Sequence, residues 1–349
     1  MKQTVCVLFG GKSSEHEISR LSANNVLSYI DRTLFDVITV GIDKSGNWFL
    51  TEASNEEIKT GAWENCNNKA CVLSPNPKHH GLLVFNKNGD VSVTRIDVAY
   101  PVLHGKNGED GTVQGLFQLA EIPFVGPGVL ASSLCMDKVL TKEVLQQAGI
   151  PVTEGFFVWN DNYDAENVHK EIEETFGYPV VIKPSRAGSS VGVVAVNCQA
   201  ELAKALEIAG QEDEKILIER SVDAREVECA VLGTTQDPVA SCVGEIVKEG
   251  MYDYATKYEK DTARIEIPAN LTEEEQATIR SMACRAFTAA DCCGLSRVDF
   301  FIDKNNGKIL LNEINTLPGF TDISMYPMLW KESGLSGTAL VTRLISLAK

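Results

Sequence analysis

The sequence has no apolar run long enough to cross a membrane, and its first residues lack the apolar region of a signal peptide. It also lacks a basic surplus, because a formal net charge of −16 leaves no basic surface for a nucleic acid or an anionic membrane. Internal repeats and low-complexity tracts are absent as well. These absences predict a cytoplasmic globular protein without a nucleic-acid or membrane partner.

The ten cysteines and five histidines lack the spacing of a disulfide framework or a zinc site. Only Cys292 and Cys293 are adjacent, and we expect reduced cysteines that mostly pack in the interior. A Walker A loop is also lacking. Gly11-Lys12-Ser13 resembles the end of that motif, but Cys6 stands where its first glycine is required. The sequence therefore excludes a P-loop nucleotide site.

The length of 349 residues suits two or three compact units. In the first unit, apolar strands are expected at residues 5–9, 36–42 and 97–103, with a helix at 15–30 after a glycine turn. This alternation predicts a parallel sheet with crossover helices. Prolines and glycines cluster at residues 123–128, where the first unit should end.

The rest of the chain begins with one expected helix over residues 129–147, because Gly149 and Pro151 follow it. A turn rich in glycine and serine then separates two short strands, which predicts a hairpin flap over residues 178–196. The Asn306-Gly307 pair predicts a second hairpin. The expected elements are strands at 178–183, 191–196, 215–218, 226–232, 240–247, 296–302 and 308–314, and a helix at 272–290. Residues 248–265 have no period, which is typical of a functional or disordered loop.

The second hairpin carries the most informative group of polar residues. Arg297 and Asp299 point to one face of their strand, and Glu313 and Asn315 share one face of the neighbouring strand. Burying these groups without a ligand is costly, and their oxygen donors suit Mg²⁺ held together with substrate phosphates. A solvated strand face with cross-strand ion pairs is the alternative.

Two isolated lysines, Lys138 and Lys183, stand in apolar surroundings and could hold nucleotide phosphates together with N–H groups at residues 188–190. The alternative is an ammonium group that reaches past its apolar neighbours to solvent. Glu219 and Glu226 flank the next turn and could bind ribose hydroxyls. Glu15 starts a helix after a glycine turn, where it either holds a polar substrate or only complements the helix dipole.

Several motifs stand in a fixed order along residues 10–327: Gly-Gly-x-Ser-x-Glu, His-Gly-x-x-Gly-Glu-Asp-Gly, Met-Asp-Lys, Lys-Pro-Ser-Arg-x-Gly-Ser-Ser, Tyr-Asp-Tyr-x-x-Lys-Tyr, Arg-Val-Asp and Asn-Glu-Ile-Asn-Thr-x-Pro-Gly. Together they resemble the D-alanine–D-alanine ligases. The resemblance implies an α/β protein of three-domain ATP-grasp architecture, with a Rossmann-like N-terminal parallel sheet and an α+β pair of nucleotide-binding domains. The expected domains are residues 1–126, 127–222 and 223–349, with a lid loop at 248–265. A homodimer is also implied.

The resemblance further implies the ATP-dependent joining of two D-alanines through an acyl phosphate, for peptidoglycan precursor synthesis. By matching motif positions, it assigns reaction chemistry to Glu15, Ser189, Tyr258, Arg297 and Gly319, and ATP binding to Lys138, Lys183, Ser190, Glu219, Glu226 and Lys257. It assigns substrate binding to His104, Tyr252, Ser324 and Met325, and two Mg²⁺ or Mn²⁺ ions to Asp299, Glu313 and Asn315.

The second substrate is the main alternative that the sequence leaves open. Vancomycin-resistance relatives join D-alanine to D-lactate or D-serine, and the lactate makers depart from the Lys257-Tyr258 ending that this chain keeps. The serine makers resemble one another in carrying phenylalanine at the position of Tyr252 and arginine at that of Met325. D-alanine is therefore favoured over D-serine. A catalytically silent ATP-binding relative is disfavoured, because every metal and phosphate position is filled. A glutathione-synthetase-like ligase is disfavoured because it would lack the Tyr-Asp-Tyr motif and the turn that carries Glu15.

Overall fold

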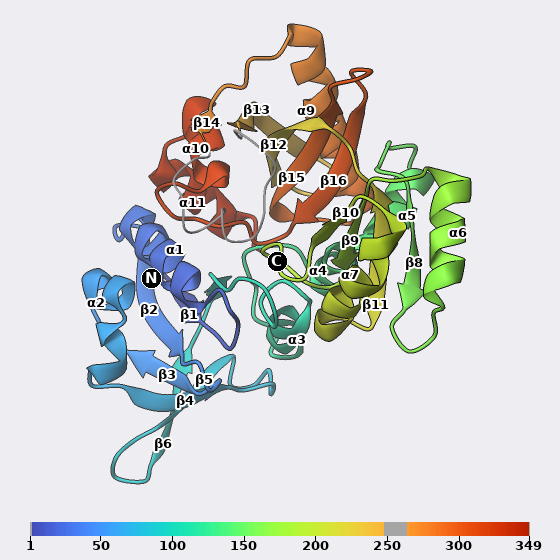
Figure 1. The fold of residues 1–349 in the computed structure, drawn as a ribbon. Coiled ribbons are helices and arrows are strands. Elements are labelled where there is room, and N and C mark those ends of the chain that lie inside the picture. The colour runs from blue at the N-terminus through green and yellow to red at the C-terminus, as the bar shows by residue number, and fades with distance from the viewer. Residues whose placement is uncertain (1, 248–263, 349) are drawn as a thin grey trace.

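The computed structural model describes residues 2–247 and 264–348, which form three β-sheets flanked by helices (Figure 1). The first sheet has seven strands in the order β6-β5-β4-β3-β2-β1-β7. Its strands are β1 (Gln3–Gly10), β2 (Phe35–Ile42), β3 (Trp48–Thr51), β4 (Lys69–Leu73), β5 (Gly81–Phe85), β6 (Val91–Arg95) and β7 (Val98–Pro101). The helices of this part are α1 (His16–Tyr29), α2 (Asn55–Thr60), the 3-10 helix η1 (Ala62–Asn65) and α3 (Thr112–Leu119).

The predicted parallel sheet is confirmed at its centre, where β1 pairs in parallel with β2 on one side and β7 on the other. β1 is apolar and buried over most of its length, as expected for a central parallel strand. The strands β3 to β6 extend this sheet in antiparallel pairing, which the sequence did not predict. Short turns at residues 43–47, 74–80 and 86–90 explain three of these pairings, because such turns can only join antiparallel neighbours. The strands β3 and β4 are instead joined by residues 52–68, which include α2 and η1.

The second sheet has the order β10-β9-β11-β8. Its strands are β8 (Gly155–Trp159), β9 (Val180–Pro184), β10 (Val194–Val196) and β11 (Lys215–Arg220), and its helices are α6 (Ala165–Thr175) and α7 (Gln199–Glu212). The predicted hairpin flap is confirmed by antiparallel pairing of β9 with β10. Both helices bury their apolar sides on one face of the sheet, among residues such as Ile172, Leu206 and Ile216. The opposite face carries polar Lys183 beside apolar Leu217.

The third sheet is antiparallel throughout and has the order β14-β13-β12-β15-β16. Its strands are β12 (Ala224–Gly233), β13 (Pro238–Val247), β14 (Arg264–Glu266), β15 (Gly294–Asp303) and β16 (Ile309–Asn315). Its helices are α9 (Glu273–Ala289), α10 (Met325–Glu332) and α11 (Gly337–Ser346). Thr272 and Glu275 form a capping box that fixes the start of α9, and Phe287 of that helix packs in a core with Val298. The β15–β16 hairpin confirms the prediction made from Asn306-Gly307.

The single helix expected over residues 129–147 is wrong, because two helices occupy this segment: α4 (Val129–Met136) and α5 (Lys138–Gln147). Asp137 separates them with an extended backbone and caps α5 by accepting the Leu140 N–H. Its carboxylate also accepts hydrogen bonds from Ser185 and Lys215 of the second sheet. These distant contacts draw Asp137 out of the helix, and sequence periodicity does not report them.

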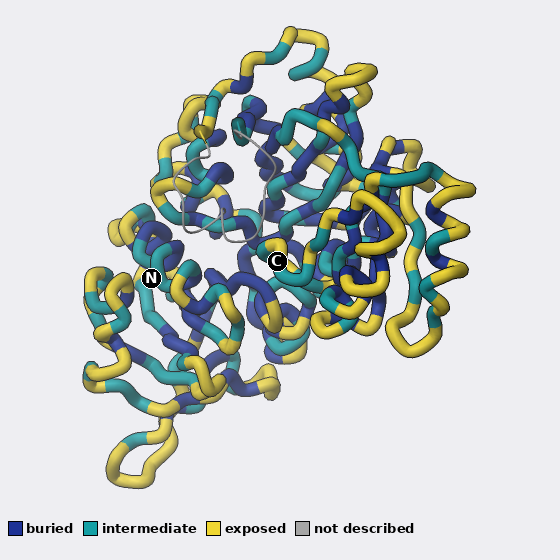
Figure 2. Tube along the Cα trace, viewed as in Figure 1, coloured by how far each residue is buried: buried dark blue, intermediate teal, exposed yellow. Residues whose placement is uncertain are grey.

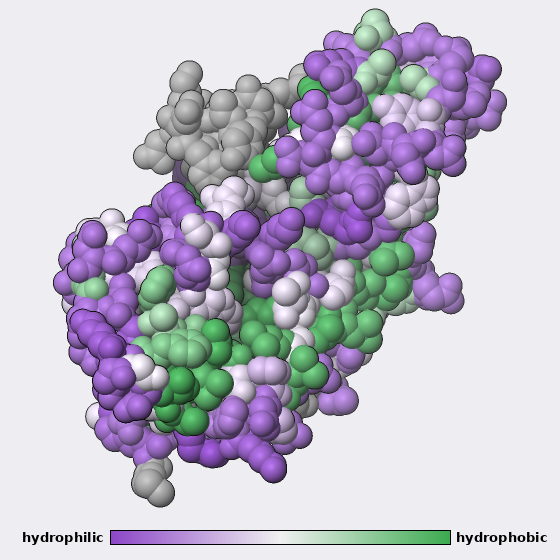
Figure 3. Space-filling model, turned by 90° about the horizontal axis from the view of Figure 1, so that it is seen from below, coloured by the Kyte–Doolittle hydropathy of each residue, from purple (hydrophilic) through white to green (hydrophobic). Residues whose placement is uncertain are grey.

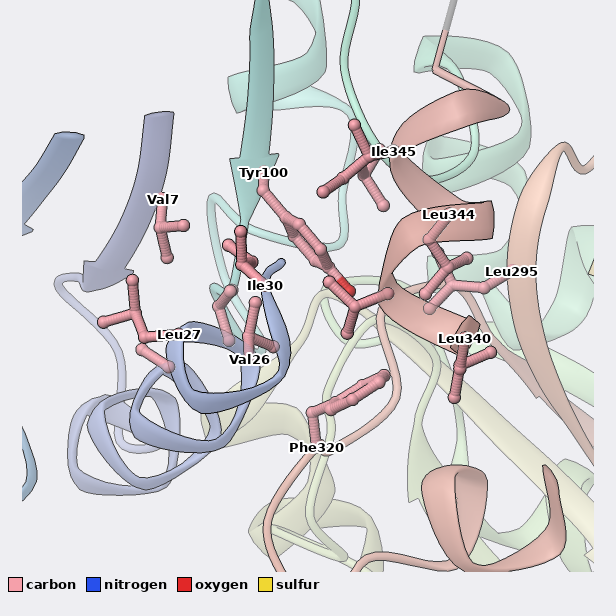
Figure 4. Close-up of a cluster of buried hydrophobic side chains, with 14 of the residues drawn as sticks. Val7, Val26, Leu27, Ile30, Tyr100, Leu295, Phe320, Leu340, Leu344 and Ile345 are labelled. Atoms are coloured by element: carbon pink, nitrogen blue, oxygen red, sulfur yellow. The ribbon is translucent and has the colours of Figure 1, made fainter. Parts of the chain in front are cut away.

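A continuous apolar core joins the two ends of the chain. Figure 4 shows Val26, Ile30 and Tyr100 from the N-terminal part facing Leu340 and Leu344 of α11. Figure 2 shows buried segments where the three sheets approach one another and exposed segments at outer turns such as the β5–β6 hairpin. In the described part of the chain, no helix is both long and apolar enough to span a membrane. The three domain boundaries remain a prediction.

Candidate active site

The β15–β16 hairpin brings its four polar residues together as the sequence suggested. Asp299 lies directly opposite Glu313, and Arg297 lies opposite Asn315. The Asn315 side-chain amide donates to Asp299 Oδ2 at 2.9 Å. Asp299 is 9% exposed, so the alternative of a solvated strand face does not hold there, although a cross-strand ion pair, the other part of that alternative, joins Arg297 to Glu228. Two carboxylates and an amide oxygen form a donor set that suits Mg²⁺.

Arg297 is held in this face by two carboxylates. Its Nε lies 2.9 Å from Glu228 Oε2, and its Nη2 lies 2.7 Å from Asp299 Oδ2. Burial alone would lower the pKa of Arg297, but Asp299, Glu228 and Glu313 raise that pKa well above its usual value. The guanidinium therefore stays charged in the interior. Glu228, which the sequence analysis missed, lies opposite Asp299 on β12 and two residues after Glu226, on the same face.

Lys138 connects the flap to the carboxylate face. This first residue of α5 donates from Nζ to the Ala187 carbonyl at 2.6 Å and lies 3.8 Å from Glu313 Oε2. Within the flap, Ser189 and Ser190 have φ angles of 51° and 58°. This left-handed backbone is unusual for residues with a Cβ atom and is common at functional sites. Lys138 thus joins the flap loop to the carboxylate face.

Lys183 lies on β9 and contacts the buried carboxylate of Glu219 on β11. A second lysine, Lys142 of α5, contacts the other oxygen of Glu219. The predicted phosphate ligand Lys183 and the predicted adenosine contact Glu219 are therefore direct partners. Lys142 was not predicted, although its position four residues after Lys138 places both on one side of α5.

Glu15 faces the flap. Its Oε1 accepts a hydrogen bond from Ser189 Oγ at 2.6 Å, and its side chain makes no capping bond to α1. Glu15 thus directs its side chain to the flap rather than to the helix backbone, and its role in substrate binding stays a prediction. Gly105 approaches the same carboxylate so closely that a Cβ there would lie 2.6 Å from Glu15 Oε2, and its φ is +70°. Only glycine fits at this point of the His-Gly-x-x-Gly-Glu-Asp-Gly motif.

His104 is buried and holds the segment that follows β16. Its Nδ1 lies 3.0 Å from the Leu317 carbonyl, and its Nε2 lies 2.9 Å from Ser22 Oγ. Burial lowers the pKa of His104, so the ring is neutral and Nδ1 carries the proton that it donates to the carbonyl. Ser22 Oγ also accepts the Phe320 N–H at 3.1 Å. Both ring nitrogens thus contact protein groups beside Gly319, and a substrate contact of His104 stays a prediction.

Glu109 is a further residue that the sequence analysis did not assign. Its carboxylate accepts the Gly105 N–H at 2.7 Å and the Leu317 N–H at 3.3 Å, which ties the same two segments together. Burial and the nearby Glu15 raise the pKa of Glu109 to about 8. The acid therefore holds a proton more tightly than a free carboxyl does.

The predicted acceptor residues lie at the start of α10. Ser324 Oγ accepts the Thr321 N–H at 2.9 Å, and a Cβ on Gly319 would come within 2.8 Å of that oxygen. Met325 is 5% exposed and packs beside Gly244 and Leu329. Ser324 and Gly319 are therefore neighbours. The predicted residues Tyr252, Lys257 and Tyr258, and most of the predicted lid at 248–265, lie outside the described residues.

Two family models match the chain in tandem. The model described as D-ala D-ala ligase N-terminus matches residues 4–127, and that described as D-ala D-ala ligase C-terminus matches residues 144–346. Among curated proteins, a D-alanine–D-alanine ligase of Acetivibrio thermocellus is 48% identical, covering 99% of this chain and 96% of the relative. The D-alanine–D-alanine ligase of Clostridium acetobutylicum is 46% identical, and the match covers 100% of this chain and 98% of that relative.

Solved structures of two ligases are similar to this chain over nearly its whole length. VanG D-Ala:D-Ser ligase from Enterococcus faecalis has a TM-score of 0.91 and 38% identity, with 99% of each chain covered. The D-alanine-D-alanine ligase from Coxiella burnetii has a TM-score of 0.87 and 33% identity, covering 99% of this chain and 93% of that one. The similarity therefore spans the whole chain in both sequence and fold.

Proposed function

The chain belongs to the D-alanine–D-alanine ligase family, and from this premise we propose that it joins two D-alanines to D-alanyl-D-alanine at the expense of ATP. The observation that carries the proposal is a continuous line of contacts through the site. Glu15 contacts Ser189, the neighbouring Ala187 carbonyl accepts from Lys138, and Lys138 approaches Glu313. The residues to which we assign the substrate ammonium group, a phosphate and a metal ion therefore adjoin one another.

The proposed reaction has two steps. The terminal phosphoryl group of ATP passes to the carboxylate of the first D-alanine, which gives an acyl phosphate and ADP. The amine of the second D-alanine then attacks the acyl carbon, the tetrahedral oxyanion collapses, and phosphate leaves as the peptide bond forms. The product would serve as a precursor of peptidoglycan.

Residues of the described chain fit separate parts of this chemistry. Glu15 would bind the ammonium group of the first D-alanine, which fixes its carboxylate relative to the phosphates. Arg297 and the Gly319 N–H would stabilise the oxyanion, because charge that develops in a dry site is best met by preorganised donors. Ser324 would hold the carboxylate of the second D-alanine. The phosphates of ATP would be bound by Lys138, Lys183 and the Ser190 N–H. The adenosine would be bound by Glu219 and Glu226.

The donor set fits a divalent cation. Asp299, Glu313 and Asn315 present carboxylate and amide oxygens on one face, and we propose that they hold two Mg²⁺ or Mn²⁺ ions together with ATP. Such ions offset negative charge on the phosphoryl group during transfer. Among the residues that the structure describes, His, Cys, Asp and Glu form no cluster of three that could hold a metal, so phosphate oxygens would complete the coordination.

We propose a homodimer in the cytoplasm as the working form. Figure 3 shows apolar residues gathered across one face of the molecule, and exposed leucines such as Leu119 on α3 and Leu130 on α4 are the kind of surface a subunit interface covers.

D-serine is the second candidate for the acceptor, because a D-Ala:D-Ser ligase is among the similar structures. The buried, apolar Met325 beside Ser324 favours a methyl group instead. We expect kcat/KM for D-alanine to exceed that for D-serine by at least about 10-fold with D-alanine as donor, since a hydroxyl gains nothing from an apolar wall. Separation of the dipeptide products checks this expectation. A preference for D-serine would replace the proposed product with D-alanyl-D-serine.

A further inference from the structure

Lys142 is a buried cation for which the proposed reaction has no use. It lies on α5 one turn after Lys138, and its side chain is 8% exposed. Its ammonium group contacts Glu219 Oε1, and in the described part of the chain no other polar partner is found for it. A buried ammonium group is costly to desolvate, so its single contact needs an explanation.

Glu219 is a carboxylate shared by two lysines. Its side chain is 2% exposed, Oε1 contacts Lys142 and Oε2 contacts Lys183. Burial alone would raise the pKa of Glu219, but Lys183 and Lys142 hold that pKa below its usual value. Burial lowers the pKa of Lys142, and Glu219 opposes that change. One lysine is enough to balance one carboxylate, so with both lysines protonated the group carries one positive charge more than Glu219 requires.

The extra charge matters once a nucleotide is bound. Lys183 would then turn at least part of its ammonium group from Glu219 toward a phosphate. Without a second cation, that movement would leave an uncompensated carboxylate in the interior, which is strongly unfavourable. Lys142 would prevent this loss of charge balance, because its ammonium group remains in contact with Glu219 Oε1 when Lys183 turns toward the phosphate.

We propose that Lys142 is a positioning residue that holds Glu219 ionised and in place and so leaves Lys183 free to bind a nucleotide phosphate. The inference rests on the proposed function for the roles of Lys183 and Glu219. Lys142 itself touches neither nucleotide nor substrate and acts through Glu219.

A purely structural role for Lys142, as an anchor of α5 on the second sheet, needs a matched control. Lys215 of β11 provides it, because its buried ammonium group pairs with Asp137 at 2.6 Å, at the start of the same helix. Lys215→Met removes a buried lysine that joins α5 to the same sheet without touching Glu219. Lys142→Met leaves Glu219 and Lys183 as a one-to-one pair, so we expect it to fold.

The test measures ATP binding with Mg²⁺ and without D-alanine, by calorimetry on the unreacted protein. We expect Lys142→Met to weaken ATP binding about 10–100-fold, a change of about 1.4–2.8 kcal/mol. The kcat at saturating ATP and the KM for D-alanine should stay within about threefold of wild type. Lys215→Met should lower the melting temperature and leave the Kd of ATP within about threefold. Unchanged ATP binding by folded Lys142→Met would overturn the proposal.

A double-mutant cycle with Glu219→Gln tests whether Lys142 acts through Glu219. In the Glu219→Gln background, Lys142→Met should change the Kd of ATP by less than about threefold. An undiminished effect there would show that Lys142 acts by another route and would overturn the proposal. If Lys142→Met does not fold by itself, the double variant is compared with Glu219→Gln alone, and a Kd difference well above threefold would overturn the proposal. Failure of the wild-type protein to bind ATP would contradict the proposed function rather than the role of Lys142.

Discussion

Glutamine in place of Glu313 is expected to lower kcat by several powers of ten while the fold stays intact. The change keeps the shape of the side chain but removes one of the two opposed carboxylates that would bind the cations. Phosphoryl transfer depends mainly on positioning and on neutralising charge, so losing a metal ligand should remove most of the catalysis. Steady-state kinetics at saturating Mg²⁺, with circular dichroism for the fold, measure the effect.

Glu245→Gln is the matched control for that experiment. Glu245 is a buried carboxylate of the same sheet that pairs with Arg225, and it lies opposite Val227, on the face that packs against α9. We expect its loss to affect stability more than turnover. Near-normal turnover of folded Glu313→Gln would contradict the metal assignment.

Arg297→Met should lower both the stability of the fold and kcat, and it is the second variant for which we expect a large effect. The guanidinium is buried between Glu228 and Asp299, so its removal leaves two neighbouring carboxylates without their cation. Removing one partner of a buried ion pair typically costs about 3–5 kcal/mol of stability. The loss of a proposed oxyanion donor should lower kcat by a further factor of about 10²–10³.

Separating these two effects requires a second variant and a binding measurement. Arg297→Lys keeps the charge without the planar fork, so it should recover more stability than turnover. ATP affinity of the folded variants should change much less than kcat. If Arg297→Lys turned over at the wild-type rate, the guanidinium would have no specific part in the chemistry.

The sequence predicted the parts of the site that follow local rules. The alternation of side chains along β15 and β16, and the Asn306-Gly307 turn between them, were enough to bring Asp299 and Glu313 to one face. The family motifs likewise brought Glu15 and Ser189 together, although they lie in different sheets' loops. The hairpin prediction depends on short segments whose geometry the residues themselves determine, whereas the pairing of Glu15 with Ser189 came from the family resemblance, because the two residues lie far apart in the chain.

The features that were missed depend on contacts between distant segments. Asp137 breaks the predicted helix because Ser185 and Lys215 bind its carboxylate. Lys142 was missed because its contact with Glu219 of β11 is a tertiary contact between distant segments. The antiparallel strands β3 to β6 were missed because they are short, and their pairing is decided by turns and by tertiary packing rather than by periodicity. Tertiary packing decides each of these outcomes, so a pattern within one segment does not contain them.

The proposed mechanism requires an acyl phosphate formed from D-alanine and ATP, and transfer of an oxygen isotope reveals whether it forms. D-alanine labelled with ¹⁸O in its carboxylate is incubated with ATP, Mg²⁺ and the protein, and the released phosphate is analysed by mass spectrometry. Phosphorylation of the carboxylate requires one labelled oxygen to leave with phosphate when the second D-alanine attacks. We therefore expect one ¹⁸O atom in each phosphate and one D-alanyl-D-alanine for each ADP. Unlabelled phosphate would contradict the account, because it would mean that ATP is cleaved without activating the D-alanine carboxylate.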